Sequence, residues 1–446
     1  MTLADLIARS GAGERGLESR AHRLAFADFA RFSAIGADLG ALAGRSVILH
    51  VRDMALAAAA LIDLDGLASR IVLCPPGWGP EPLAQAAERA EADAIVHDRL
   101  VPPLQLPVAV QAALPMRPRP AVKLAAQATE WVLPTSGTSG PPKLVVHTLE
   151  TLAGALTDAP PQQWATFYDI RRYGGLQILL RALAGAESLT LGDPSESVDA
   201  FLVRLGEAGA THISGTPSHW RKVLMSGEAA RIAPQRVRLS GEIADDAVIA
   251  GLRALYPRAH VEHAYASTEA GVAFVVSDGR AGFPANFVGD DGEVALRIVD
   301  DVLRIRSNRA ALRYLGAEAP ALKDSDGFVD TGDVVARNGD RCLFVGRRGG
   351  VINVGGAKVH PEEVEAALNA HRAVRASRVF ARRNPITGAL VAAEVVLSEG
   401  VAADEATKRD ILAACRAALP AYKAPSFLNF VAELPMTDGG KLVRHG

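Results

Sequence analysis

Short apolar runs alternate with amphipathic segments along the first part of the chain. The runs at residues 46–51, 70–74 and 94–98 read SVILHV, RIVLC and AIVHD, and the segments between them have helical periodicity. Such alternation of strands and helices favours a mostly parallel sheet that is covered by helices. The pattern resumes at residue 149 and continues to residue 267. We therefore predict the α/β fold class, with a large N-terminal domain of parallel-type sheets.

Two stretches near the N-terminus depart from this alternation. Residues 25–42, AFADFARFSAIGADLGAL, have helical periodicity and are predicted to be helical. Residues 102–120 contain six prolines, which lack a backbone N–H group, so we predict an extended connector there.

The pattern changes again after Phe287. Between residues 292 and 347 short runs such as GEVALRIVD and RCLFVGR alternate apolar and polar positions. This alternation predicts antiparallel strands in a small barrel-like subdomain. Beyond the glycines at 346–350, an amphipathic helix, two strands and a second helix predict a small α+β domain. We accordingly divide the chain into an N-terminal domain, 1–346, and a C-terminal domain, 347–446.

Composition narrows the class of protein. The 446 residues are 49% hydrophobic and 22% charged, which suits two or three domains with large cores. The net charge of −2, without a long basic run, argues against a nucleic-acid partner. Cys74, Cys342 and Cys415 are far apart, which fits buried thiols in a reducing compartment. No apolar stretch approaches the length of a membrane span and no signal peptide is recognisable, so we expect a cytoplasmic protein.

The strongest candidate for chemistry is the segment from Trp131 to Thr148, WVLPTSGTSGPPKLVVHT. Two apolar runs flank a loop made of Thr135, Ser136, Gly137, Thr138, Ser139 and Gly140. Glycines let the backbone approach a ligand closely, and successive N–H groups with short hydroxyls bind anions. Lys143 adds a positive charge at the rim of the loop. The segment therefore predicts a loop that holds a polyphosphate.

Two other interpretations of this loop are weaker. A flexible linker is rarely flanked by runs such as VLP and LVV, which are typical of buried strands. A Walker-type loop requires Gly-Lys-Ser/Thr before a helix, whereas Lys143 follows Pro142 and precedes a strand-like run.

Two acidic motifs follow. In HAYASTEAG, residues 263–271, Thr268 can donate to a phosphate oxygen and Glu269 can bind Mg²⁺, which takes one or two carboxylates plus substrate phosphates. In DGFVDTGDVV, the carboxylate of Asp333 can accept from both hydroxyls of a ribose. The alternatives are an ordinary strand end for the first motif and a common Gly-Asp turn for the second.

Together these motifs resemble those of the adenylate-forming superfamily, which includes acyl-CoA and aryl-CoA ligases. TSGTSGPPK is similar to its phosphate loop, and residues 265–269 resemble its Tyr-Gly-x-Thr-Glu motif, with Ala266 in place of the glycine. Further matching positions are Gly346, Arg347, Gly355, Gly356, His360, Pro361, Glu363 and Glu365, and, at the C-terminus, Pro435, Thr437, Gly440, Lys441 and Arg444. The family's hinge aspartate is replaced by Gly349, beside Arg348.

The resemblance implies an ATP- and Mg²⁺-dependent ligase that acts in two half-reactions. A carboxylate first attacks the α-phosphate of ATP, and a thiol of CoA or pantetheine then displaces AMP. Lys441 would be the catalytic lysine, with Thr268 and Glu269 beside it. Nucleotide contacts would come from the phosphate loop, Lys143, Gly241, Glu242, His263, Ala264, Tyr265, Ala266, Ser267, Asp333 and Arg347. The resemblance also implies that residues 347–446 form a mobile lid domain. Arg348 and Gly349 would form its hinge, and Gly355 and Gly356 the thiol channel.

The acid pocket is expected at Tyr168, Arg172, Gly215, Ser240 and Gly241. Arg172 falls where amino-acid-adenylating relatives carry an aspartate, which argues against a free amino acid as substrate. The alternative is that Arg171 and Arg172 face solvent or pair with Asp169. The resemblance favours an aryl or short-to-medium acyl acid. The N-terminal part is short for the family, which would reduce contacts with CoA and leaves a carrier protein open as acceptor. A non-catalytic nucleotide-binding homologue is the alternative of another class.

Overall fold

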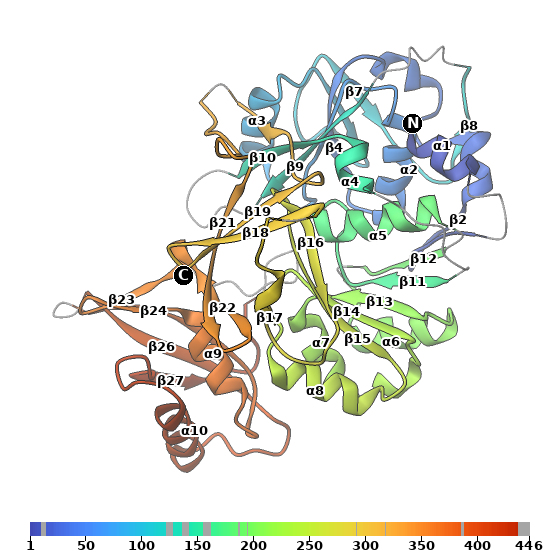
Figure 1. Cartoon of the computed structure of the whole chain (residues 1–446). Coiled ribbons are helices and arrows are strands. Elements are labelled where there is room, and N and C mark those ends of the chain that lie inside the picture. The colour runs from blue at the N-terminus through green and yellow to red at the C-terminus, as the bar shows by residue number, and fades with distance from the viewer. Residues whose placement is uncertain are drawn as a thin grey trace.

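A computed structural model describes residues 1–9, 15–121, 128–135, 142–154, 162–185, 188–193, 195–290, 292–316, 318–384 and 388–435. Within these residues the N-terminal part contains two large sheets with helices between and outside them (Figure 1). The predicted α/β architecture is confirmed.

The first sheet has eight strands in the described residues and is parallel except at its two edges. Their order is β16 (Gly271–Val276), β15 (His260–Ser267), β14 (Arg236–Ser240), β13 (His212–Gly215), β11 (Gln163–Thr166), β12 (Ser188–Leu191), β1 (Gly16–Glu18) and β2 (Arg23–Ala25). One face packs on α6 (Val198–Glu207), α7 (Pro217–Leu224) and α8 (Asp246–Leu255).

The second sheet has seven strands in the described residues. Their order is β20 (Arg313–Tyr314), β10 (Lys143–His147), β9 (Glu130–Thr135), β5 (Arg70–Leu73), β4 (Ser46–His50), β6 (Ala94–His97) and β7 (Val108–Gln111). α3 (Pro80–Arg89) covers its outer face. Between the two sheets, α1 (Leu3–Arg9), the wholly buried α2 (Met54–Leu64), the short α4 (Leu149–Ala153) and α5 (Tyr173–Ala184) complete a shared apolar core.

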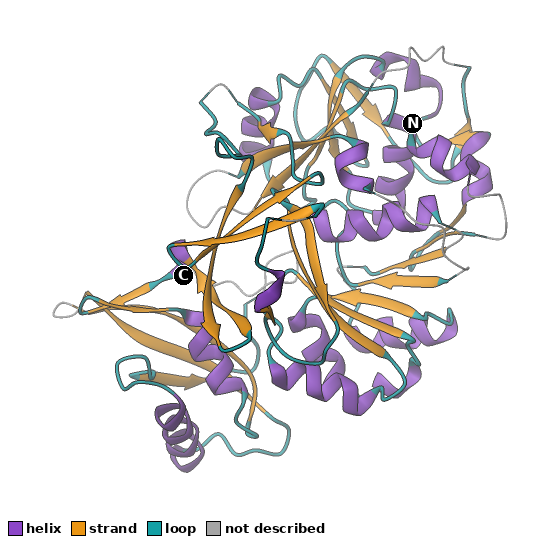
Figure 2. Ribbon diagram, in the orientation of Figure 1, coloured by secondary structure: helices purple, strands orange, loops and turns teal. Residues whose placement is uncertain are grey.

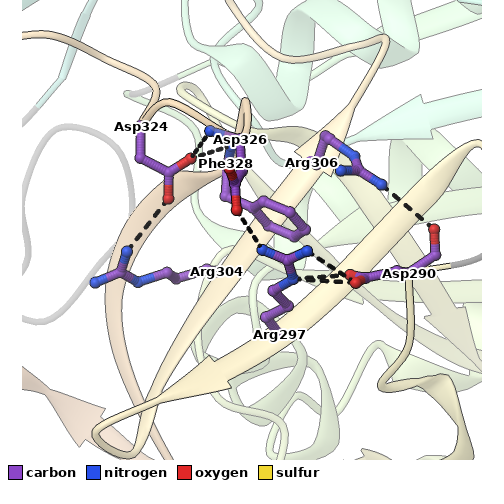
Figure 3. A network of polar contacts seen from close by, with 7 residues as sticks. All are labelled: Asp290, Arg297, Arg304, Arg306, Asp324, Asp326 and Phe328. Atoms are coloured by element: carbon purple, nitrogen blue, oxygen red, sulfur yellow. Dashed lines mark hydrogen bonds and ion pairs between the residues drawn. The ribbon is translucent and has the colours of Figure 1, made fainter.

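An antiparallel sheet follows, as predicted from the change of pattern after Phe287. It contains β17 (Phe283–Pro284), β22 (Arg341–Arg347), β21 (Val329–Asn338), β19 (Val302–Ser307) and β18 (Val294–Val299). On its surface the guanidinium groups of Arg297 and Arg306 lie 4.2 and 4.8 Å from the ring centre of Phe328 (Figure 3). Arg297 is also held by Asp290 and Asp326, at 2.8 and 2.9 Å. The arginine stems thereby cover an aromatic side chain on an exposed face of the sheet.

The C-terminal part forms a separate group of strands and helices (Figure 2), and it has its own apolar core. Its sheet consists of β24 (Ala357–Val359), β23 (Ile352–Val354), β26 (Gly388–Leu397), β25 (Val374–Asn384) and β27 (Phe427–Phe430). α9 (Pro361–Asn369) and α10 (Glu405–Ala418) pack against this sheet.

Two sequence predictions near the N-terminus were confirmed only in part. Residues 25–42 form two 3₁₀ helices, Phe26–Ala30 and Gly36–Leu42, separated by β3 (Phe32–Ser33). The buried carboxylate of Asp63 accepts from the hydroxyl of Ser33 at 2.7 Å, which holds the chain out of a continuous helix. The proline-rich connector contains β7, which extends the second sheet, and β8 (Arg117–Pro118), which pairs with β3. The three cysteines are free and buried, as predicted.

Candidate active site

The phosphate-loop candidate connects two antiparallel strands, β9 and β10. Thr135 pairs with Lys143 at the open end of this hairpin. Ser136, Gly137, Thr138, Ser139 and Gly140 lie outside the described residues. The ammonium group of Lys143 lies 4.8 Å from the ring centre of Tyr314, which belongs to the neighbouring strand β20. A cation–π contact therefore fixes the lysine at the base of the loop.

The Thr268–Glu269 turn lies beside the same strands. The hydroxyl of Tyr314 donates to Oε1 of Glu269 over 3.5 Å, and the backbone oxygen of Glu269 accepts from the N–H of Ala311. Ser267 supports the turn because its hydroxyl accepts from the N–H of Ala270 at 3.0 Å. Tyr314 therefore connects the lysine of the first motif with the carboxylate of the second.

His147, at the end of β10, contacts the backbone of the Thr268–Glu269 turn. Its Nε2 lies 2.7 Å from the backbone oxygen of Thr268, and its Nδ1 lies 2.9 Å from the hydroxyl of Thr151. A carbonyl oxygen only accepts, so Nε2 carries the proton of the neutral ring. Burial lowers the pKa of His147 to about 4. The imidazole is thus neutral at physiological pH and joins the two motifs by a fixed donor.

Asp333 is the centre of the third motif. Its Oδ2 accepts from the hydroxyl of Tyr265, and its Oδ1 accepts from Nε of Arg347 at 2.9 Å. Burial and the Asp333 carboxylate raise the pKa of the Tyr265 phenol well above its usual value, so the hydroxyl keeps its proton and donates. A carboxylate has about four lone-pair sites, which leaves two for the hydroxyls of a sugar.

The ring of Tyr265 belongs to an aromatic cluster. It stacks on Phe344 at 5.1 Å and on Phe274 at 5.5 Å between ring centres. In this structure the residue therefore orients Asp333 through its hydroxyl and packs through its ring. The contact of Tyr265 with the nucleotide stays a prediction.

Four of the predicted acid-pocket residues, Tyr168, Gly215, Ser240 and Gly241, lie together. The hydroxyl of Tyr168 donates to the backbone oxygens of Gly215 and Ser240, at 2.6 and 2.9 Å. Tyr168 follows β11, and Gly215 and Ser240 are the last residues of β13 and β14, so Tyr168 closes the carboxyl edge of three neighbouring strands. Gly241 follows directly and has a φ of 86°.

The two arginines before α5 differ. Arg171 is fully buried and pairs with Asp169 at 2.7 Å. For this residue the alternative of an ion pair with Asp169 is therefore confirmed. Arg172 occupies the cap position of α5, and its Nε has no hydrogen-bond partner among the described residues.

Other predicted site residues lie elsewhere or serve other contacts. Nε2 of His263 lies 3.1 Å from the backbone oxygen of Arg280, and Oε2 of Glu242 accepts from the N–H of Ser218 at the start of α7. Ala264 is buried in β15 on the opposite face from His263, and Ala266 packs against the shared core.

The predicted hinge and thiol segment lie past β22. Arg348 pairs with Asp330 at 3.1 Å, and Gly349 is in the 3₁₀ turn Arg348–Gly350. Gly355 and Gly356, with φ of 58° and 93°, form the exposed two-residue turn between β23 and β24. Both residues of such a turn need positive φ. Lys441 lies outside the described residues.

Sequence reasoning missed His147 and Tyr314. His147 is within the quoted phosphate-loop segment, but a single histidine after a strand carries no signal of its own. Tyr314 is far along the chain from Lys143 and Glu269, and the pairing of β10 with β20 that brings it there has no sequence signature.

Glu269 suits a Mg²⁺ ion that is bound mainly by the phosphate oxygens of the substrate. Among the described residues no group of three or more His, Cys, Asp or Glu side chains could hold a metal by itself. Glu269 offers one carboxylate oxygen beyond the contact with Tyr314. Mg²⁺ usually takes one or two carboxylates and completes its shell with water and phosphate oxygens, so this single carboxylate fits.

Comparison with known proteins identifies the family. The model of the AMP-binding enzyme family matches residues 37–302, and that of the AMP-binding enzyme C-terminal domain matches residues 363–441. The chain belongs to the AMP-binding enzyme family, as the resemblance predicted. It is an adenylate-forming enzyme that activates an acid with ATP.

Relatives include CoA ligases and a larger synthase. The 2-succinylbenzoate–CoA ligase of Listeria innocua is 28% identical over 71% of this chain and 69% of that protein. The isonitrile lipopeptide synthase of Streptomyces coeruleorubidus is 29% identical over 71% of this chain, but over only 23% of that protein.

Solved structures share the fold over nearly the whole length. An anthranilate CoA ligase in complex with anthranoyl-AMP has a TM-score of 0.84 at 18% identity, with 99% of this chain and 95% of that chain covered. A benzoate CoA ligase from Burkholderia xenovorans LB400 has a TM-score of 0.79 at 20% identity, with 99% and 98% covered. In the described segments, no helix combines the length and apolar character that a bilayer crossing requires.

Proposed function

We propose that this chain is an AMP-forming acid–thiol ligase that converts an aryl or short-to-medium acyl acid into a thioester, with CoA as the acceptor. The observation that carries the proposal is the convergence of three distant motifs: Lys143 and Glu269 meet at Tyr314, His147 holds Thr268, and Asp333 is set between two donors. The match to CoA ligases supports the choice of acceptor.

The first half-reaction brings a carboxylate to an anionic phosphate. Thr135, Lys143 and the loop between them would hold the β- and γ-phosphates, with Thr268 donating to a phosphate oxygen. Asp333 would accept from the ribose hydroxyls, and Arg347 would hold its carboxylate in place. Glu269 would hold Mg²⁺, which would supply positive charge against the charge that develops on pyrophosphate. Preorganised donors and cations of this kind each contribute about 10²–10³ in rate.

The second half-reaction requires a different lid position. We assign residues 1–346 to the nucleotide-binding domain and 347–446 to a lid that carries Lys441. In the first step Lys441 would bridge the acid and the α-phosphate. Rotation about Arg348 and Gly349 would then withdraw it and bring Gly355 and Gly356 to the thiol.

Two other functions differ in their observable products. Loading of a carrier-protein pantetheine would give a thioester with the holo-carrier and little with free CoA. The larger synthase relative, of which this chain covers only 23%, favours keeping this alternative. A non-catalytic nucleotide-binding protein would release no pyrophosphate with any acid.

The test measures the two half-reactions separately. Pyrophosphate release is followed with aryl, fatty and dicarboxylic acids, and thioester formation is followed from supplied acyl-AMP with CoA or a holo-carrier. We expect Lys441→Ala to lower pyrophosphate release about 10²–10³-fold and to spare the second step.

Lys408→Ala is the matched control for this test. Lys408 is another lysine of the C-terminal part, on α10, where it pairs with Glu405, and its substitution should leave both steps intact. Equal loss of both steps in Lys441→Ala would contradict the two-position lid, and absence of pyrophosphate with every acid would reject the ligase.

A further inference from the structure

The inner face of the first sheet changes from apolar to polar beside the acid pocket. On β11 and β12 this face carries Trp164 and Leu189, which are in the core shared with α5. On the next three strands, β13, β14 and β15, the cross-strand neighbours on the same face are Ser214, Arg238 and Glu262. The hydrophobic core therefore stops where this row of polar side chains begins.

The polar row is buried and only partly satisfied. The side chains of Arg238 and Glu262 are 17% and 5% exposed, and Ser214 is fully buried. Nη1 of Arg238 lies 3.4 Å from Oε1 of Glu262, which is an ion pair without a well-formed hydrogen bond. The hydroxyl of Ser214 and Oε1 of Glu262 have no hydrogen-bond partner among the described residues. Buried polar groups normally have such partners, so the hydroxyl of Ser214 and Oε1 of Glu262 can each still form a hydrogen bond.

The charges in this row do not balance. Glu262 also faces Arg236 at 3.6 Å and His260 at 3.4 Å, and the charge of Arg181, on α5, acts on Arg238. Arg236 and Arg238 therefore flank the carboxylate of Glu262, and Arg181 adds a third positive charge near Arg238. The excess positive charge favours an anionic group over a neutral one.

The row is continuous with the acid pocket. Arg238 is two residues before Ser240 on β14, so both side chains face the same way, about 7 Å apart along the strand. The hydroxyl of Tyr168 bonds to the backbone of Ser240 directly above. A substrate whose reacting carboxylate lies at the strand ends would extend its far end onto Arg238.

We propose that the acid substrate carries a second, anionic acceptor group such as a carboxylate, and that Arg238 binds it at the floor of the pocket. Arg238 is therefore a specificity-determining residue. The inference rests on the proposed function, because it concerns the acid that the ligase activates. A purely apolar tail would bury Arg238 and Ser214 against carbon and leave their polar groups without hydrogen bonds.

The test compares acids that differ only at the far end. Pyrophosphate release is measured with adipate against hexanoate, and with terephthalate against para-toluate. We expect the wild-type enzyme to prefer the dicarboxylic acid by at least about 10-fold in kcat/KM. Arg238→Leu should remove or reverse this preference, since a site built for polar contacts discriminates strongly against analogues that lack them.

Arg236→Leu is the matched control. Arg236 faces the same Glu262, but it lies further from Ser240 and its side chain is 41% exposed, so the preference should change less than about 3-fold. Arg238→Lys, which keeps the charge, should retain part of the preference, and thermal unfolding of each variant shows whether it is folded. The assignment would be overturned if Arg238→Leu lowered kcat/KM equally for both acids of a pair. It would also be overturned if Arg236→Leu changed the preference for the dicarboxylic acid as much as Arg238→Leu does. If no acid supports pyrophosphate release, the ligase function itself is rejected.

Discussion

Tyr314 is a single side chain that serves two motifs. Its ring faces the ammonium of Lys143 at 4.8 Å, and its hydroxyl reaches Glu269 at 3.5 Å. Burial, followed by the charge of Glu269, raises the pKa of the phenol, so the hydroxyl stays protonated and donates to the carboxylate. One aromatic residue thereby sets the separation of a cation and an anion that would hold the same triphosphate.

The two functions of Tyr314 can be separated by substitution. Tyr314→Phe keeps the ring below Lys143 and removes only the hydroxyl, so we expect about 3–10-fold weaker binding of ATP in the presence of Mg²⁺. Tyr314→Leu removes both contacts and should weaken binding further, with and without Mg²⁺. Calorimetric titration of ATP at several Mg²⁺ concentrations measures both effects independently of turnover.

The matched control for this prediction is Tyr422→Phe. Tyr422 is 47% exposed in the C-terminal part of the chain, and its ring is 6.0 Å from Lys423, so ATP affinity should not change. An unchanged affinity in Tyr314→Leu would show that the tyrosine only fills space.

At the scale of elements, alternation of strands and helices was sufficient to predict the fold class. It failed where short-range patterns were overridden by distant contacts. Residues 25–42 have helical periodicity, but Asp63 binds Ser33 and interrupts a helix there. β7 lies among prolines that suggested a connector, because an edge strand tolerates flanking prolines.

The site was predictable as motifs but not as a network. The hydroxyl-rich loop, Thr268–Glu269 and Asp333 each carry local sequence signals for nucleotide chemistry. The contacts of Tyr265 with Asp333 and of His147 with Thr268 join positions far apart in the chain. Only the order of strands in the sheets determines such contacts, and no local pattern encodes that order.

His147 links β10 to the Thr268–Glu269 turn and gives this link a pH dependence. The pKa of His147 is lowered to about 4 from an ordinary value of 6.5, so the unfolded chain binds this proton more readily. The stability it contributes is complete above about pH 6.5 and is lost as the pH falls toward 4.

We expect His147→Gln to remove this part of the pH dependence. The amide of glutamine donates like Nε2 but does not titrate. Between about pH 7.5 and pH 5, the free energy of unfolding should fall by about 1–2 kcal/mol less in the variant than in the wild type. Urea unfolding at both pH values measures this difference. Identical pH profiles would show that the pKa of His147 does not differ between the folded and the unfolded protein.

At the scale of the whole molecule, the C-terminal part meets the rest at the end of β22. Gly346 has a φ of 146°, and a Cβ at this position would lie 2.5 Å from Oε2 of Glu362 and 2.9 Å from Nδ1 of His360. The start of α9 therefore packs directly on the backbone before the hinge. In Figure 1, the β23–β24 hairpin with Gly355 and Gly356 extends away from the two large sheets. We assign this arrangement to the adenylation step, because a thiol-transfer position would bring that hairpin inward.

Gly346→Ala tests this assignment. The new methyl group would press on His360 and Glu362 in a backbone conformation that disfavours side chains, at a cost of about 1–3 kcal/mol. Since the clash exists only while α9 packs on β22, we expect pyrophosphate release to fall about 5-fold or more. Thioester formation from supplied acyl-AMP should change little.

Gly350→Ala is the control, because a Cβ there meets nothing within 4 Å. A loss confined to thioester formation would instead assign this packing to the second half-reaction. The hairpin would then have to reach the thiol by a movement other than rotation about Arg348 and Gly349.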